Sequence, residues 1–258
     1  MQAYIDLAAD MADAARRVTL AAAERVLACD DKADGGAFDP VTEADREAER
    51  VMRALVEARF PDHGIAGEEM ALREARGRLG WSLDPIDGTR AFICGLPGWT
   101  TLIALLEDGA PVLGLIDAPR LDERYVGASG RAWLVRDGIE TRLETSGCVR
   151  LDQAKLATTD PFLFSGEEKA AFDRLRGSVR LTRYGFDAYA YARLAAGRID
   201  LVAESGLKPH DVNALVPVIR GAGGIVGNWR GGEDLTEGQL LAAASRELFR
   251  AAVETLAG

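Results

Sequence analysis

The segment WSLDPIDGTRAF, residues 81–92, places two aspartates between the end of a strand-like apolar run and the start of a helix. Asp84 and Asp87 are three positions apart, and a Gly-Thr pair follows at once. Hard divalent cations prefer oxygen ligands, and Mg²⁺ takes them in near-octahedral order. The two carboxylates and the intervening carbonyl of Ile86 would offer three oxygens to one small volume, so the segment predicts a metal site.

The helix expected after Asp87 begins at Gly88 and Thr89. The first N–H groups of a helix have no partner within it, and together with the helix dipole they favour a phosphate. Gly88 also lets the backbone approach such a ligand closely. Metal ions and a phosphate could therefore lie side by side, which suits hydrolysis of a phosphate ester. The alternative is that Asp87 only caps the helix.

Further acidic residues stand where a strand or loop gives way to a predicted helix. Asp45 follows Thr42 in a pattern that is also typical of a helix-capping pair. Asp211 could likewise only cap its helix, and the pair Glu68–Glu69 could be an ordinary solvated pair. None of these positions decides the function alone.

Composition limits the classes of function. The chain has 258 residues, 48% of them hydrophobic, as in a soluble globular protein. The net charge of -10 argues against a nucleic-acid partner, whose phosphates need a basic surface. Three cysteines without a C-x-x-C pair favour free thiols, and two histidines are too few for a His-rich zinc site.

Apolar spacing predicts two helices and then an antiparallel sheet in the first part of the chain. The helices are expected at 3–28 and 42–58, and the strands at 64–69, 81–85, 101–118 (two strands about an Asp-Gly turn) and 131–143. Strands and helices then alternate, with a single helix expected at 211–224. The pattern predicts a layered α/β protein with an N-terminal lobe, 1–145, and a C-terminal lobe, 146–258.

The N-terminal region is alanine-rich but interrupted by charges, so we expect no signal peptide. The sequence has no run of 18 apolar residues, and we therefore expect no membrane span. These features favour a cytoplasmic enzyme.

Taken together, the motifs resemble the inositol monophosphatase superfamily, and specifically its histidinol-phosphate phosphatase branch. The matching segments are DPVTEAD at 39–45, GEE at 67–69, DPIDGT at 84–89 and HDVNALVPVIRGAGG at 210–224. The resemblance implies an αβαβα sandwich, a homodimer, and a lithium-sensitive phosphatase that uses two or three Mg²⁺ ions per site. It implies a small phosphate ester as the partner molecule.

The resemblance also assigns roles to residues of this chain. It implies metal ligation by Glu68, Asp84, the Ile86 carbonyl, Asp87 and Asp211. Glu68 would help to activate the attacking water, and Thr89, hydrogen-bonded toward Asp45, would orient it. The N–H groups of Gly88 and Thr89 would hold the phosphate. The remaining roles are a mobile loop at Lys32 and contacts to the leaving group from Glu204 and Asp187.

The branch is suggested by Arg90-Ala91-Phe92 and by the L-K-P-x-D segment at 207–211. Histidinol phosphate carries a cationic amine and an imidazole, which an extra carboxylate at Asp187 would suit. Asp187 could instead cap its helix, and Arg90 could be a surface residue, although a cation in the first turn opposes the helix dipole. His210 has no assigned role.

The leading hypothesis is a Mg²⁺-dependent phosphomonoesterase that hydrolyses L-histidinol phosphate to L-histidinol in histidine biosynthesis. The alternative within the class is a phosphatase for inositol 1-phosphate or another small ester. A more distant alternative is a metal-binding regulatory protein without turnover.

Overall fold

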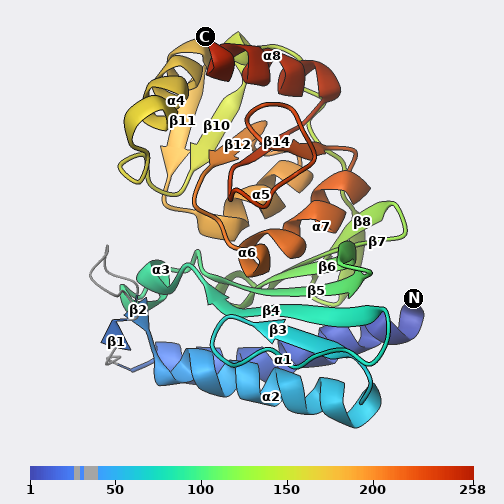
Figure 1. Ribbon diagram of the computed structural model, residues 1–258. Coiled ribbons are helices and arrows are strands. Elements are labelled where there is room, and N and C mark those ends of the chain that lie inside the picture. Colours follow the sequence, from blue (N-terminus) through green and yellow to red (C-terminus); the bar gives the residue numbers. More distant parts are fainter. Residues whose placement is uncertain (26–29, 32–39) are drawn as a thin grey trace.

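The computed structural model describes residues 1–25, 30–31 and 40–258. Five layers follow one another through the molecule (Figure 1). The outer helices α1 (Gln2–Ala23) and α2 (Glu43–Arg59) cover a seven-stranded sheet, and the central layer holds α5 (Asp187–Ala195), α6 (Pro209–Asn213) and α7 (Leu215–Gly221). A five-stranded sheet and the outer helices α4 (Gly166–Ser178) and α8 (Arg246–Ala257) complete the αβαβα sandwich that the sequence predicted.

The seven-stranded sheet has the order β3-β4-β5-β6-β7-β8-β9. Its strands are β3 (Gly64–Gly67), β4 (Leu79–Asp87), β5 (Thr100–Glu107), β6 (Ala110–Ala118), β7 (Glu123–Ala128), β8 (Arg131–Arg136) and β9 (Ile139–Arg142). The prediction of an antiparallel sheet was wrong at one edge, because β3 pairs parallel to β4. Strand β7 was not predicted. The predicted Asp-Gly turn at Asp108–Gly109 is confirmed, and both residues have positive φ.

The five-stranded sheet has the order β11-β10-β12-β14-β13. Its strands are β10 (Lys155–Thr158), β11 (Leu181–Tyr184), β12 (Leu201–Glu204), β13 (Ile225–Gly227) and β14 (Leu240–Ala243). The first three are mutually parallel, and β14 and β13 are added antiparallel. Short elements link the main ones: β1 (Asp30–Asp31), β2 (Pro40–Val41), α3 (Thr89–Ile93) and the 3₁₀ turns Pro119–Leu121 and Leu151–Gln153.

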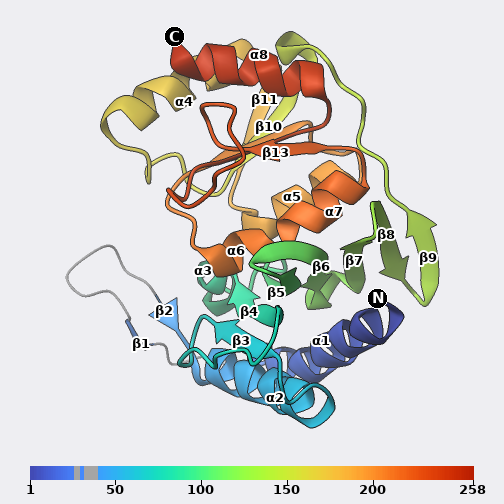
Figure 2. The same ribbon diagram turned by 45° about the vertical axis from the view of Figure 1, so that its right-hand side comes forward.

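Three main hydrophobic clusters fill the spaces between the layers. One packs α1 and α2 against the large sheet through Leu7, Met11 and Trp81. A second places α5 and α7 against the other face of that sheet and against β12. The third lies between the small sheet and α4 and α8. The central helices therefore contact both sheets (Figure 2). The division of the chain at residue 145 into two lobes stays a prediction.

The single helix predicted over 211–224 is broken at Ala214. Pro217 has no N–H to donate to the carbonyl of Asn213, and its ring would collide with that carbonyl in a continuous helix. The chain therefore bends between α6 and α7. Gly114 on β6 admits the bend, because a Cβ there would lie 2.0 Å from the carbonyl oxygen of Ala214.

The first helix ends at Ala23, and residues 26–28 of its predicted range lie outside the described part of the chain. In the part that the structure describes, every helix is too short or too polar to cross a membrane. Cys94 and Cys148 are free thiols, and Cys29 lies among the residues that the structure does not describe.

Candidate active site

A β-bulge turns Asp84 and Asp87 toward the same side of β4. Asp84 pairs with Leu102 and Asp87 with Thr100, so three steps on β4 match two on β5. Residues three apart on a regular strand point to opposite faces, and the extra residue removes that alternation. The Thr101 hydroxyl donates 2.8 Å to the carbonyl of Pro85 and so fixes the bulge.

Glu68 is brought beside Asp84 by the parallel pairing of β3 and β4. Gly67 pairs with Leu83, and the Glu68 N–H donates 3.2 Å to the Leu83 carbonyl. The carboxyl ends of the two strands thus meet at one edge of the sheet. The neighbouring Glu69 N–H donates 2.7 Å to the buried Glu49 carboxylate on α2, which anchors this turn.

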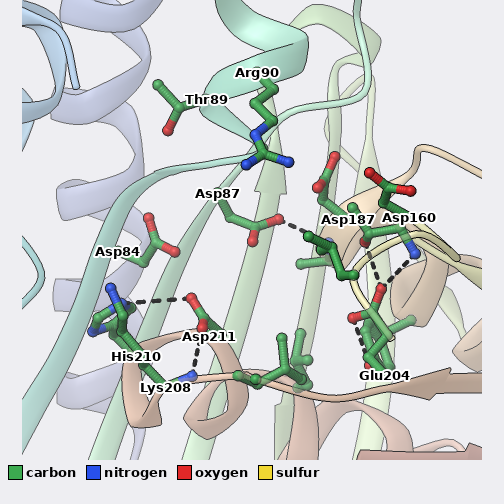
Figure 3. A pocket seen from close by; sticks show the side chains of 18 of the residues that line it. Asp84, Asp87, Thr89, Arg90, Asp160, Asp187, Glu204, Lys208, His210 and Asp211 are labelled. Atoms are coloured by element: carbon green, nitrogen blue, oxygen red, sulfur yellow. Dashed lines mark hydrogen bonds and ion pairs between the residues drawn. The ribbon is translucent and has the colours of Figure 1, made fainter. Parts of the chain in front are cut away.

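Asp211 reaches the same region from the first turn of α6. One of its oxygens accepts a 2.6 Å hydrogen bond from the Lys208 N–H, so the helix-capping role is also present. The other oxygen lies 3.5 Å from Nε2 of His210, which is 4.0 Å from a Glu68 oxygen. Carboxylate oxygens of Asp84, Asp87 and Asp211 all lie within 4.8 Å of one another (Figure 3).

This carboxylate cluster has the electrostatics of a cation site. Burial raises the pKa of Asp84 well above its ordinary value, and repulsion from Glu68 and Asp87 raises it further. Burial and the charge of Asp187 raise the pKa of Asp87, and burial raises that of Asp211 against the opposing effect of His210. Oδ1 of Asp84 is buried without a hydrogen-bond partner. The donor set and the orphaned oxygen fit a hard divalent cation.

The turn after β4 leads into α3 as expected, but it is capped differently. Gly88 is the N-cap residue at φ 83°, and no side chain caps the helix. Asp87 is therefore not the cap of α3. The Thr89 hydroxyl donates 3.0 Å to the Ile86 carbonyl, and the expected hydrogen bond between Thr89 and Asp45 is not formed among the described residues.

Asp45 lies on α2 and caps its own helix. Its Oδ2 accepts hydrogen bonds of 2.8 Å from the Thr42 N–H and 2.6 Å from the Thr42 hydroxyl, which satisfies the capping alternative. Its Oδ1 is buried without a partner, and burial raises its pKa. The charge of Glu68 contributes to that rise, so Asp45 is electrostatically connected to the site.

Helix α5 begins against the turn at the end of β4, which carries Asp87. The Ala188 N–H donates 2.7 Å to Oδ2 of Asp87, and Thr100 donates 3.3 Å to the same oxygen. Asp187, the residue before Ala188, has a φ of 43°. It is the first residue of α5, whose N-cap is Phe186, so Asp187 is not the cap. Burial raises the Asp187 pKa to about 6, against the opposing charge of Arg90.

Glu204 ends β12 and is almost fully buried. One oxygen accepts from the Thr159 N–H at 2.7 Å and from its hydroxyl, and the other accepts 2.9 Å from the Tyr191 hydroxyl. Burial raises the pKa of Glu204 to about 7 despite these hydrogen bonds. Thr159 and Tyr191 were not identified from the sequence, because nothing local to either residue marks it as a partner of a distant glutamate.

A cavity of about 260 Å³ joins these groups. Most of the predicted site residues line it: Glu68, Asp84, Ile86, Asp87, Gly88, Thr89, Arg90, Asp187, Glu204 and Asp211. Asp45 is not among the residues that line it, and Lys32 lies outside the described residues. The cavity is also lined by Asp160, Leu163, Lys208 and His210. Lys208 and His210 belong to the L-K-P-x-D segment, whereas nothing in the sequence marks Asp160 or Leu163 as site residues.

The layering and this acidic cavity define a class of phosphate-ester hydrolases, and comparison with known proteins agrees. The sequence model of the inositol monophosphatase family matches residues 1–257, and the chain belongs to that family. The family is one of phosphomonoesterases.

Individual relatives carry different substrate names. The chain is 45% identical over 238 residues to the chloroplastic bifunctional phosphatase IMPL2 of Arabidopsis thaliana, covering 88% of this chain and 68% of that protein. It is 32% identical to a histidinol-phosphatase of Chlorobaculum parvum, covering 95% and 93%. An inositol monophosphatase structure from Zymomonas mobilis superimposes with a TM-score of 0.87 at 41% identity, covering 100% and 98%.

Proposed function

We propose that this protein is a Mg²⁺-dependent phosphomonoesterase that hydrolyses L-histidinol phosphate. The observation that carries the substrate assignment is the distribution of charge along the cavity. Asp187 lines it beside the turn at Gly88, and Asp160 lines it beyond Asp187, on the side away from Asp84 (Figure 3). A leaving group with an ammonium and an imidazole would find complementary charge there.

The residues around Asp84 and Gly88 would bind the cations and the phosphate. Asp84, Asp87, Asp211, Glu68 and the Ile86 carbonyl would hold divalent cations, two or three in number. When bound, these cations would polarise the phosphoryl group and lower the pKa of a bound water. The backbone of Gly88 and Thr89 would hold the phosphate at the start of α3.

Glu68 and Thr89 are proposed to position the attacking water. Glu68 lies at the end of β3 beside Asp84, and its position in the cavity lets it accept a proton from a water there. The Thr89 hydroxyl donates to the Ile86 carbonyl, which holds the side chain in one rotamer. Its oxygen would then accept a hydrogen bond from the water in a fixed direction. Asp45 would act through the electrostatic interaction of its carboxylate with Glu68 and not through a direct hydrogen bond.

Turnover of myo-inositol 1-phosphate is the second candidate function, favoured by the likeness to the Zymomonas mobilis protein. The test is phosphate release from both esters side by side, with and without Mg²⁺. Mg²⁺-dependent release with a higher kcat/KM for histidinol phosphate supports the proposal. A higher kcat/KM for the inositol ester would refute the substrate assignment and keep the metal chemistry.

The homodimer, the lithium sensitivity and the cytoplasmic location remain predictions. Equilibrium sedimentation, inhibition by LiCl at constant ionic strength, and fractionation of the source cells would test them separately.

A further inference from the structure

Three carboxylates line the leaving-group end of the cavity, and they differ in how many hydrogen bonds they accept from the protein. Glu204 has both oxygens occupied by Thr159 and Tyr191, so it has little capacity left for a ligand. The Asp187 carboxylate lies close to the phosphate-binding turn, because one of its oxygens is 2.9 Å from where a Cβ on Gly88 would lie. Asp187 is therefore placed for a group near the ester oxygen.

Asp160 is the carboxylate that has one oxygen left to accept a hydrogen bond from a ligand. It follows β10, and its Oδ1 accepts a 2.9 Å hydrogen bond from the Phe162 N–H, which fixes the side chain in a local turn. Among the described residues, its other oxygen makes no hydrogen bond or ion pair. Figure 3 shows Asp160 beyond Asp187, on the side of the cavity away from Asp84.

The wall next to Asp160 is apolar. Leu163 lines the cavity and is 53% exposed, and Phe164, which also lines it, is almost fully buried against Phe172 and Trp229. A half-exposed leucine beside an uncommitted carboxylate suits a flat ring that carries an N–H donor. An aliphatic polyol carries hydroxyl groups around its ring or chain and would offer Leu163 no apolar face to pack against.

From these positions we infer that Asp160 and Leu163 form the subsite for the imidazole of the leaving group, with Asp160 accepting a ring N–H. This inference rests on the proposed function and makes it more specific. Asp187 then faces the ammonium group, which lies nearer to the ester in histidinol phosphate. Asp160 is thereby a specificity-determining residue, separate from the metal ligands.

The test uses a ratio of two esters. L-Alaninol phosphate carries the same ammonium group as L-histidinol phosphate and lacks the ring. In Asp160→Asn, the amide oxygen still accepts the Phe162 N–H, so the turn is kept and only the charge is lost. We expect the ratio of kcat/KM for histidinol phosphate over alaninol phosphate to fall about tenfold, chiefly through KM.

Asp234→Asn is the matched control. Asp234 accepts from the Thr236 N–H at 3.0 Å in the same kind of turn, outside the cavity, and its substitution should leave the ratio unchanged. Leu163→Ala should lower the ratio as well, because it removes the apolar wall. An unchanged ratio in Asp160→Asn would overturn the inference. Wild-type protein that is inactive on histidinol phosphate and active on another ester would instead refute the proposed function.

Discussion

The backbone N–H of Ala188 donates a 2.7 Å hydrogen bond to Oδ2 of Asp87, 101 residues earlier in the chain. A carboxylate expected to bind metal therefore also caps a helix from the central layer. The contact ties the metal-site turn to the element that carries Asp187. Any ligand that changes the position or charge of Asp87 will therefore change the hydrogen bond at the start of α5.

Asp84→Asn should abolish catalysis without unfolding the protein. The substitution removes a buried charge whose Oδ1 has no partner, so the variant without metal should unfold at a higher temperature than the wild type. Phosphate release should fall at least about 100-fold because a cation ligand is lost. A variant that keeps its activity would exclude Asp84 from the metal site, whereas a wild type without turnover would favour the regulatory alternative.

Mg²⁺ should stabilise the protein more as the pH rises. The pKa values of Asp84, Asp87 and Asp211 are raised, so protons compete with the cation at pH values where ordinary aspartates, with a pKa of about 3.9, are ionised. At 100 times Kd the cation adds about 2.7 kcal/mol to the free energy of unfolding. We expect the Mg²⁺-induced rise in Tm to be larger at pH 8 than at pH 5, measured against NaCl of equal ionic strength. Equal rises at both values would contradict the proposed ligands.

Glu204→Gln should stabilise the protein at neutral and alkaline pH. The folded-state pKa of Glu204 is about 7, raised by burial from an ordinary 4.5. The folded protein then holds a proton that the unfolded chain has lost, so wild-type stability is full below about pH 4.5 and falls as the pH rises through 7. The difference above pH 7 is at most roughly 3 kcal/mol.

Urea unfolding of wild type and Glu204→Gln at pH 4.5 and pH 8 would measure this effect. The glutamine can still accept from Thr159 and donate to the Tyr191 oxygen, so the two proteins should match at the lower pH. A variant that is less stable than wild type at pH 8 would show that the glutamate is ionised in the folded protein.

Gly88→Ala should reduce activity by more than the strain at its backbone explains. Gly88 and Gly95 both have positive φ, 83° and 70°, so alanine at either site costs about 1 kcal/mol of stability. Only at Gly88 does the added Cβ meet a side chain, the Asp187 carboxylate, while Gly95 has open space. We expect kcat/KM to fall more than about tenfold in Gly88→Ala and to change little in Gly95→Ala. Similar losses in both variants would point to backbone strain alone.

The sequence by itself determined which residues could do chemistry. Carboxylates at the end of an apolar strand, a Gly-Thr helix start and the apolar spacing of α1 and α2 depend only on neighbours in the chain, so local propensity and periodicity reveal them. The αβαβα arrangement followed from the resemblance to a family, since strand spacing alone does not say which strands pair.

The tertiary structure decided what each of these residues contacts. The bulge that turns Asp84 toward Asp87 depends on the register with β5, and the break at Ala214, between α6 and α7, places Asp211. The partners of Glu204 come from Thr159 and Tyr191, 45 and 13 residues away. Hydrogen bonds between distant segments leave no local pattern in a sequence, because any donor of suitable reach can fill the position once the layers have packed.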